Sequence, residues 1–173
     1  MPVSPHPHPT LDRSMTERTP PSEPGAPIDA TLWAAYRATH YVVDAPDGEV
    51  VLHVGAANDA LAALMRAVHA PTAAVLTAHN PWSLATPAHA NDAAQRELEA
   101  ALAAHGIAML PASGRDPSGA WPPETSVLAL GLTREAADAL ARRFAQNAFV
   151  WVAGPGRACE LGPTRAVAGD PGV

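Results

Sequence analysis

The chain has 173 residues, of which 47% are hydrophobic, enough for one domain with an apolar core. Its formal net charge is −6 and it has no basic run, so neither nucleic acid nor an anionic membrane is expected as a partner. The single cysteine, Cys159, excludes an internal disulfide and a cysteine-based zinc site.

The two ends of the chain differ in composition from its middle. Residues 1–28 contain eight prolines and few large apolar side chains, so we expect a disordered arm. Residues 163–173 predict a flexible tail, which leaves a single domain over 29–162. The arm lacks the apolar core of a secretory signal, and no stretch approaches the roughly 20 apolar residues of a membrane span. A cytoplasmic protein is therefore expected.

The first predicted elements are a helix, a hairpin and a second helix. Asp29 is a suitable N-cap for a helix over 30–39. Residues 40–54 hold two β-branched runs around Pro46-Asp47-Gly48, which is typical of a hairpin turn. Asn58 is the expected N-cap of the second helix, whose apolar stripe comprises Leu61, Leu64, Met65 and Val68.

The middle of the chain predicts a buried strand followed by a long helix. Residues 72–78 are nearly all apolar, as in a central strand. Thr86 and Pro87 predict the N-cap and first residue of the third helix, and Gly106 its end. Strands are expected over 107–112 and 125–132, on either side of the polar loop 113–124.

The last predicted elements are a helix capped by Thr133 and two strands, over 148–153 and 157–161. The complete order is α-β-β-α-β-α-β-β-α-β-β. This order predicts an α/β class, an α+β sandwich on a mixed sheet of six to seven strands with four helices.

The connectivity predicts that polar side chains gather at one end of the sheet, the rim. Helical crossovers normally join parallel strands, so the second, third and fourth strands should finish at the same end. An antiparallel fifth strand would bring the end of the last helix there as well, where open α/β sheets bind ligands. The residues expected at the rim are Asn58, Asn80, Ser83, Arg115, Asp116, Trp121, Glu124, Gln146 and Asn147.

Residues 79–83 have two interpretations. Asn80-Pro81 is suited to a strand end and a turn, and Ser83 to a local cap. In the functional interpretation, Asn80 and Ser83 bind a polar ligand, with an anion or carboxylate favoured by the start of the next helix.

The loop 113–124 also has two interpretations. It is either a plain connector, with Arg115 and Asp116 as an ion pair, or it carries catalytic or metal-binding carboxylates at Asp116 and Glu124. In the second case Trp121 would form a stacking wall.

Gln146 and Asn147 follow the last helix. Asn147 suits a helix C-cap in the left-handed conformation, whereas Gln146 is a candidate polar group facing the rim. The eight histidines lack ligand spacing and no cofactor-binding motif is present, so neither a metal nor a cofactor is expected.

Three segments, 32–43, 77–102 and 114–152, resemble the bacterial family catalogued as domain of unknown function 3293, continuously over about residues 32–152. Two positions depart from the pattern: His79, where tryptophan is expected, and Gln95, where asparagine or arginine is expected. The resemblance implies no activity, because none is assigned to the family. Its recurring features are Asn80-Pro81 with Ser83, Asn91, Gly114 with Asp116, Trp121 with Glu124, and Gln146-Asn147-Ala148.

Two functional hypotheses remain open. The first is a small-molecule-binding protein or enzyme whose rim recognises a polar metabolite or a nucleotide-like ligand through Asn80, Ser83, Arg115 and Gln146. Trp121 and Asn147 would complete that site, and Asp116 or Glu124 would carry a proton. The second is a non-catalytic interaction or regulatory module that presents Trp82 and Trp121 to a partner.

Overall fold

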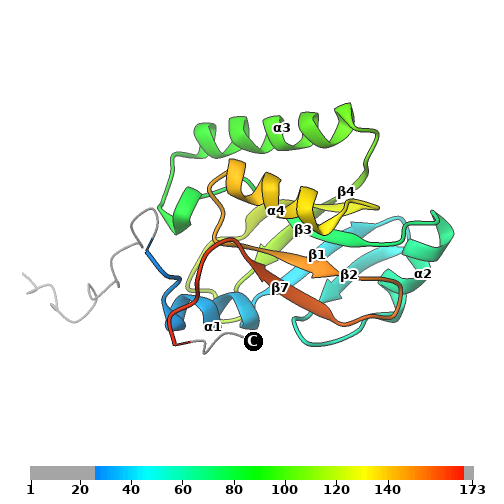
Figure 1. Ribbon diagram of the computed structural model, residues 1–173, viewed down its shortest axis with the longest axis horizontal. Coiled ribbons are helices and arrows are strands. Elements are labelled where there is room, and N and C mark those ends of the chain that lie inside the picture. Colours follow the sequence, from blue (N-terminus) through cyan, green and yellow to red (C-terminus); the bar gives the residue numbers. More distant parts are fainter. Residues whose placement is uncertain (1–25, 170–173) are drawn as a thin grey trace, which may run out of the picture.

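The computed structural model describes residues 26–169, so most of the predicted disordered arm and residues 170–173 lie outside it. The predicted order of four helices and seven strands is confirmed, and one additional short 3₁₀ turn precedes the third long helix (Figure 1). The elements are α1 (Ala30–Ala38), β1 (His40–Ala45), β2 (Gly48–Leu52), α2 (Asp59–Ala67), β3 (Ala73–Leu76), η2 (Pro81–Ser83), α3 (Ala88–Ala104), β4 (Ala108–Arg115), β5 (Glu124–Leu130), α4 (Arg134–Arg143), β6 (Ala148–Val152) and β7 (Cys159–Pro163).

Three of the four predicted helix caps are confirmed. The side chains of Asp29, Asn58 and Thr133 each accept a hydrogen bond from a backbone N–H in the first turn of their helix. The cap predicted at Thr86 is wrong, because Pro87 is the N-cap of α3 and makes no side-chain cap bond. The Thr86 amide instead donates to Asn80 Oδ1 at 3.1 Å.

The strands form one seven-stranded sheet in the order β2-β1-β4-β5-β3-β6-β7. Every ladder between these strands is antiparallel. The α/β class is confirmed, but the parallel component expected of a mixed sheet is limited to two isolated bridges, Ile28–Val167 and Val54–Cys159. Helices do connect β2 to β3 and β3 to β4, yet β5 lies between β3 and β4, and β1, β4 and β5 lie between β2 and β3.

The alternating order still makes β2, β3 and β4 run in one direction, as the connectivity predicts. They finish at the end of the sheet where β5 and β6 begin. Residues 80–83, Glu124 and residues 146–147 therefore meet at the rim, where α1 and the C-terminal segment also lie, at the left of Figure 1.

The sheet curls until its two edges meet. The Gly55 amide donates to the Cys159 carbonyl at 2.8 Å, and the Cys159 amide donates to the Ala56 carbonyl at 2.9 Å. These bonds join the segment after β2 to the start of β7, although the two are opposite edges of the strand order. We call this junction the seam.

Alternation of side chains along the strands fills a core on each face of the sheet. Leu128 and Leu130 of β5 point to one core, where they pack with Leu61 and Met65 of α2. Val127 and Ala129 point to the other core, which α3 and α4 cover (Figure 1). Within residues 26–169, no helix has the length and apolarity that crossing a membrane requires.

The packed part of the chain extends past both predicted limits, 29 and 162. Ile28 is fully buried and pairs with Val167, and Thr164 is only 1% exposed. The Thr164 hydroxyl donates to the Gln146 carbonyl at 2.6 Å. The residues after β7 are therefore fixed against the rim, at least as far as Val167, and can contribute to a site there.

Cys159 is expected to react slowly with thiol reagents. It is 1% exposed, and burial raises the pKa of its thiol from the ordinary 9.0 to about 11. Two pKa units lower the thiolate fraction at pH 8 about 100-fold. The stabilisation from the buried neutral thiol is complete below pH 9 and is lost as the pH rises towards 11.

Labelling with dithiobis(nitrobenzoate) at pH 8 should therefore be at least about 100-fold slower for the folded chain than for the chain in urea. Equal rates in the two states would show that the thiol is accessible and ionised, contrary to this assignment.

Candidate functional site

The rim contains an unusually strained turn at residues 80–83. Asn80, Trp82 and Ser83 have φ values of 46°, 55° and 61°, a left-handed conformation that side chains other than glycine rarely adopt. Such strain persists only where the surrounding structure imposes it, and it is concentrated at binding and active sites.

The Asn80 side chain holds this turn in place. Its Oδ1 accepts from the Thr86 amide and from Asn91 Nδ2, both at 3.1 Å, and its Nδ2 donates to Glu124 Oε1 at 2.6 Å. Asn91 is 6% exposed, and its Oδ1 accepts a hydrogen bond from the backbone amide of Asn80 at 2.9 Å. Asn80 is thus the centre of a network joining η2, α3 and β5, which favours its structural interpretation.

The segment after α4 holds the other side of the turn. Gln146 Nε2 donates to the His79 carbonyl at 2.9 Å, and the Trp82 amide donates to the Ala145 carbonyl at 2.7 Å. Gln146 and Asn147 are buried, with 7% and 2% exposure. The predicted C-cap at Asn147 is wrong, because Ala145 adopts the left-handed conformation, at φ 53°.

Asn147 joins two hydroxyl groups from distant elements. Its Nδ2 donates to the Tyr36 hydroxyl at 2.9 Å and to Ser83 Oγ at 3.1 Å, and the two hydroxyls are hydrogen-bonded to each other. A loop between α4 and β6 therefore connects α1 to the strained turn. We call Tyr36, Ser83 and Asn147 the rim triad.

Counting hydrogens fixes the orientation of the Asn147 amide. The three contacts of the rim triad need three hydrogens, and Nδ2 supplies two while one hydroxyl supplies the third. If Oδ1 of Asn147 pointed at the hydroxyls instead, the only hydrogens available would be those of Tyr36 and Ser83. Two hydrogens cannot make three hydrogen bonds, so one of the three contacts would have no hydrogen. Oδ1 therefore points away, and within residues 26–169 this buried oxygen has no hydrogen-bond partner.

Arg165 adds a charged group beside the turn. Its guanidinium carbon lies 4.8 Å from the centre of the Trp82 ring, a cation–π geometry. Burial lowers the pKa of Arg165, while the nearby Tyr36 phenol acts in the opposite direction. Arg165 thus places its charge close to the rim triad.

The pKa of the Tyr36 phenol is affected by two charged residues of the rim, Glu124 and Arg165. Burial is the main cause that raises its pKa, and hydrogen bonds from Ser83 and Asn147 oppose the rise. Glu124 raises the pKa further, and Arg165 lowers it to a smaller extent. Tyr36 therefore stays protonated at neutral pH and acts as a hydrogen-bonding group rather than as a base.

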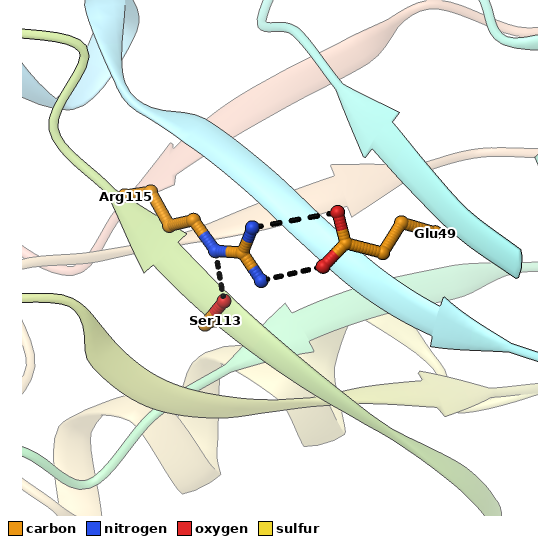
Figure 2. Close-up of polar contacts among 3 residues, drawn as sticks. All are labelled: Glu49, Ser113 and Arg115. Atoms are coloured by element: carbon orange, nitrogen blue, oxygen red, sulfur yellow. Dashed lines mark hydrogen bonds and ion pairs between the residues drawn. The ribbon is translucent and has the colours of Figure 1, made fainter.

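Three residues predicted at the rim, Asn58, Arg115 and Asp116, have their partners elsewhere. Arg115 extends from β4 over β1 to Glu49, with Nη2–Oε1 at 2.8 Å, and its Nε donates to Ser113 (Figure 2). Asn58 caps α2 and donates to the Val51 carbonyl. The predicted pairing of Arg115 with Asp116 is replaced by this cross-strand pair.

Asp116 closes its own loop. It accepts from the Ser118 hydroxyl at 2.6 Å and from the backbone amides of Ser118, Ala120 and Trp121. These bonds, the Ser118 hydroxyl first, lower the pKa of Asp116, so it remains ionised at neutral pH. Asp116 is thus a loop-stabilising carboxylate, and Trp121 beside it is 55% exposed.

The rim cluster is therefore a connected set of side chains from five segments, comprising the rim triad, Asn80, Glu124, Gln146, Trp82 and Arg165. Two shallow surface hollows, of about 300 and 240 Å³, lie elsewhere, around Phe149 and beside Trp33. Within the described part of the chain, no three side chains of His, Cys, Asp or Glu are grouped as metal ligands. The cluster can donate and accept hydrogen bonds at an open surface.

Sequence reasoning missed two members of this cluster. Tyr36 shares the apolar face of α1 with Leu32 and Trp33, and a tyrosine in such a stripe gives no sign that its hydroxyl has a distant partner. Arg165 follows Gly162-Pro163, a composition typical of a frayed end. Both could have been found by looking for charged and hydroxyl-bearing side chains that the predicted fold brings close to the rim.

Comparison with known proteins finds similarity to a family whose description names no activity. Residues 76–149 match the model of the family described as "Protein of unknown function (DUF3293)", which supports the resemblance. The match runs from the end of β3 to β6 and so includes η2, Glu124 and Asn147. The chain has no significant match among curated proteins or among solved structures.

Proposed function

We propose, from the match of residues 76–149 to a family of unknown function and from the rim geometry, that this protein binds a small polar ligand at the rim cluster. The observation that carries the proposal is the rim triad. It presents two hydroxyl groups beside a strained turn, and a buried asparagine from another segment holds both.

The energetic cost of this arrangement supports a role beyond packing. Each left-handed residue other than glycine costs of the order of 1–2 kcal/mol, although asparagine pays less, and a buried polar atom without a partner adds to the cost. A turn between β3 and α3 could be built with glycine at those positions. The chain instead places Trp82 and Ser83 there, with Trp82 half-buried and Ser83 exposed.

Glu124 is the remaining candidate for proton transfer in an enzyme. Its Oε1 accepts from Asn80, which orients the carboxylate towards the turn. Asp116 is retained only as a loop residue, for the reason given above. We therefore assign binding as the function and leave Glu124 as the residue on which a reaction would depend.

A thermal-shift screen of metabolites and nucleotides tests the proposal. The wild type is compared with the double variant Ser83→Gly/Tyr36→Phe, which removes both hydroxyls. Glycine is chosen because it adopts the φ of 61° at position 83 without strain. The expected result is a ligand that raises the melting temperature of the wild type but not of the double variant.

Ser118→Gly is the matched control, because it removes a serine hydroxyl outside the rim cluster. It should retain the ligand-dependent shift. A ligand that stabilises the double variant as much as the wild type binds elsewhere, and this result would reject the rim as the site.

A second candidate function is an interaction module, which the exposure of Trp121 favours. An indole that is 55% exposed on a loop fixed by Asp116 is a suitable anchor for a partner surface. For a second copy of the chain as partner, sedimentation velocity should show association that increases with concentration and is lost in Trp121→Ala. Monomeric wild type at every concentration would exclude self-association.

A further inference from the structure

The rim triad has one hydroxyl hydrogen to spare. Asn147 Nδ2 gives one hydrogen to each hydroxyl, and either Tyr36 donates to Ser83 or Ser83 donates to Tyr36. In both cases four hydrogens are available and three are used. The hydroxyl that keeps its hydrogen already accepts two bonds, so both its lone pairs are engaged and it can only donate.

The phenol is the stronger donor, so Tyr36 donates to Ser83 and the spare hydrogen belongs to Ser83. Ser83 is also the more exposed of the two side chains. A group that binds there must therefore offer an acceptor oxygen. Donor-only groups such as ammonium ions find no free lone pair on Ser83.

The charges beside the triad select among acceptors. Glu124 is joined to the turn through Asn80 at 2.6 Å, and the Arg165 guanidinium carbon lies 4.8 Å from the Trp82 ring centre, so the rim carries one charge of each sign. Glu124 disfavours a second carboxylate, and Arg165 disfavours a cation. Together they favour a neutral acceptor, above all one that carries an N–H group for Glu124 to accept.

We propose that the rim triad binds the carbonyl oxygen of a neutral carboxamide or lactam through the spare hydroxyl hydrogen, with Glu124 as the acceptor for the ligand's N–H. This class of ligand rests on the proposed function of the rim. It replaces the anion or carboxylate that the start of α3 suggests, because Pro87 and the Asn80 network occupy that position.

Three probes of similar size test the class: benzamide, benzoate and benzylammonium. Each is titrated into isotope-labelled wild type, and the side-chain signals of Trp82, Asn80 and Asn147 are followed by NMR. Benzamide is expected to shift these signals at concentrations at least five-fold lower than either charged probe.

The hydrogen count makes a sharper prediction for variants. Ser83→Gly removes the hydroxyl that donates to the ligand and should weaken benzamide binding at least ten-fold, whereas Tyr36→Phe leaves the Ser83 hydrogen in place and should weaken it less. The double variant has no hydroxyl hydrogen and should lose at least ten-fold. The backbone spectrum of each variant shows whether it is folded, and Ser118→Gly serves as the control.

The outcomes are distinct. Stronger shifts with benzoate or benzylammonium would overturn the ligand class while leaving the rim as the site. Unchanged benzamide binding in Ser83→Gly would overturn the assignment of the donated hydrogen to Ser83. No rim shift with any probe, while a ligand from the screen still shifts the rim, would overturn the class alone. If neither the probes nor the screen affect the rim, the proposed function fails as well.

Discussion

Replacing Asn80 with alanine is expected to lower the free energy of unfolding by about 3 kcal/mol. The change removes three side-chain hydrogen bonds, each contributing about 0.5–1.5 kcal/mol, and leaves the buried Asn91 without part of its network. It also forces alanine into a φ of 46°, which costs about 1 kcal/mol more than for asparagine. Urea unfolding followed by circular dichroism should show a lower midpoint with an unchanged slope.

Asn80→Gly separates the two contributions. Glycine loses the same side-chain bonds but tolerates the left-handed backbone, so it should be about 1 kcal/mol more stable than Asn80→Ala. Wild-type stability in Asn80→Ala would mean that Asn80 does not hold the turn. Its role would then have to be in ligand binding.

Replacing Gly162 with alanine is expected to cost about 2 kcal/mol. A Cβ at this position would lie 2.5 Å from Phe149 Cζ and 2.7 Å from its Cε1, and Phe149 is 4% exposed in the core under α4. The ring must move against close-packed neighbours, and overpacking of this kind typically costs 1–3 kcal/mol. Thermal unfolding measured by calorimetry gives the change.

Gly154→Ala is the matched control. Its Cβ would have no neighbour closer than 3.6 Å, and its φ is not positive, so its stability should stay within about 0.5 kcal/mol of the wild type. The double variant Gly162→Ala/Phe149→Leu should recover part of the loss because leucine vacates the space of the ring tip. Equal stability of the two alanine variants would contradict the proposed clash.

The elements of this fold follow closely from local sequence signals. Caps at Asp29, Asn58 and Thr133 and the turn residues between β-branched runs act within a few residues, so periodicity and capping rules locate them. The direction of β2, β3 and β4 also follows, because a helix between two strands returns the chain to the same end of the sheet. The meeting of Asn80, Glu124 and Asn147 was predictable on this basis.

The pairing of strands was not predictable in the same way. The apolar run of β3 indicates a central strand, but it does not encode which strands lie beside it, and those prove to be β5 and β6. The partner of Arg115 depends on that pairing, because β1 lies next to β4 and β2 next to β1, which brings Glu49 within reach. The roles of Tyr36 and Arg165 depend on where the first and last segments of the folded domain pack against the rim. Composition does not indicate that position.

The position of β3 has a consequence for how the chain folds during synthesis. The β1–β2 hairpin joins neighbours in sequence and can form as soon as it leaves the ribosome. β3 pairs only with β5 and β6, so one of its edges stays unpaired until β5 has been made and the other until β6 has been made. An apolar strand with open edges is prone to pair with other chains. A shortened chain that stops before β5 therefore lacks any partner for its central strand and is expected to aggregate rather than to fold.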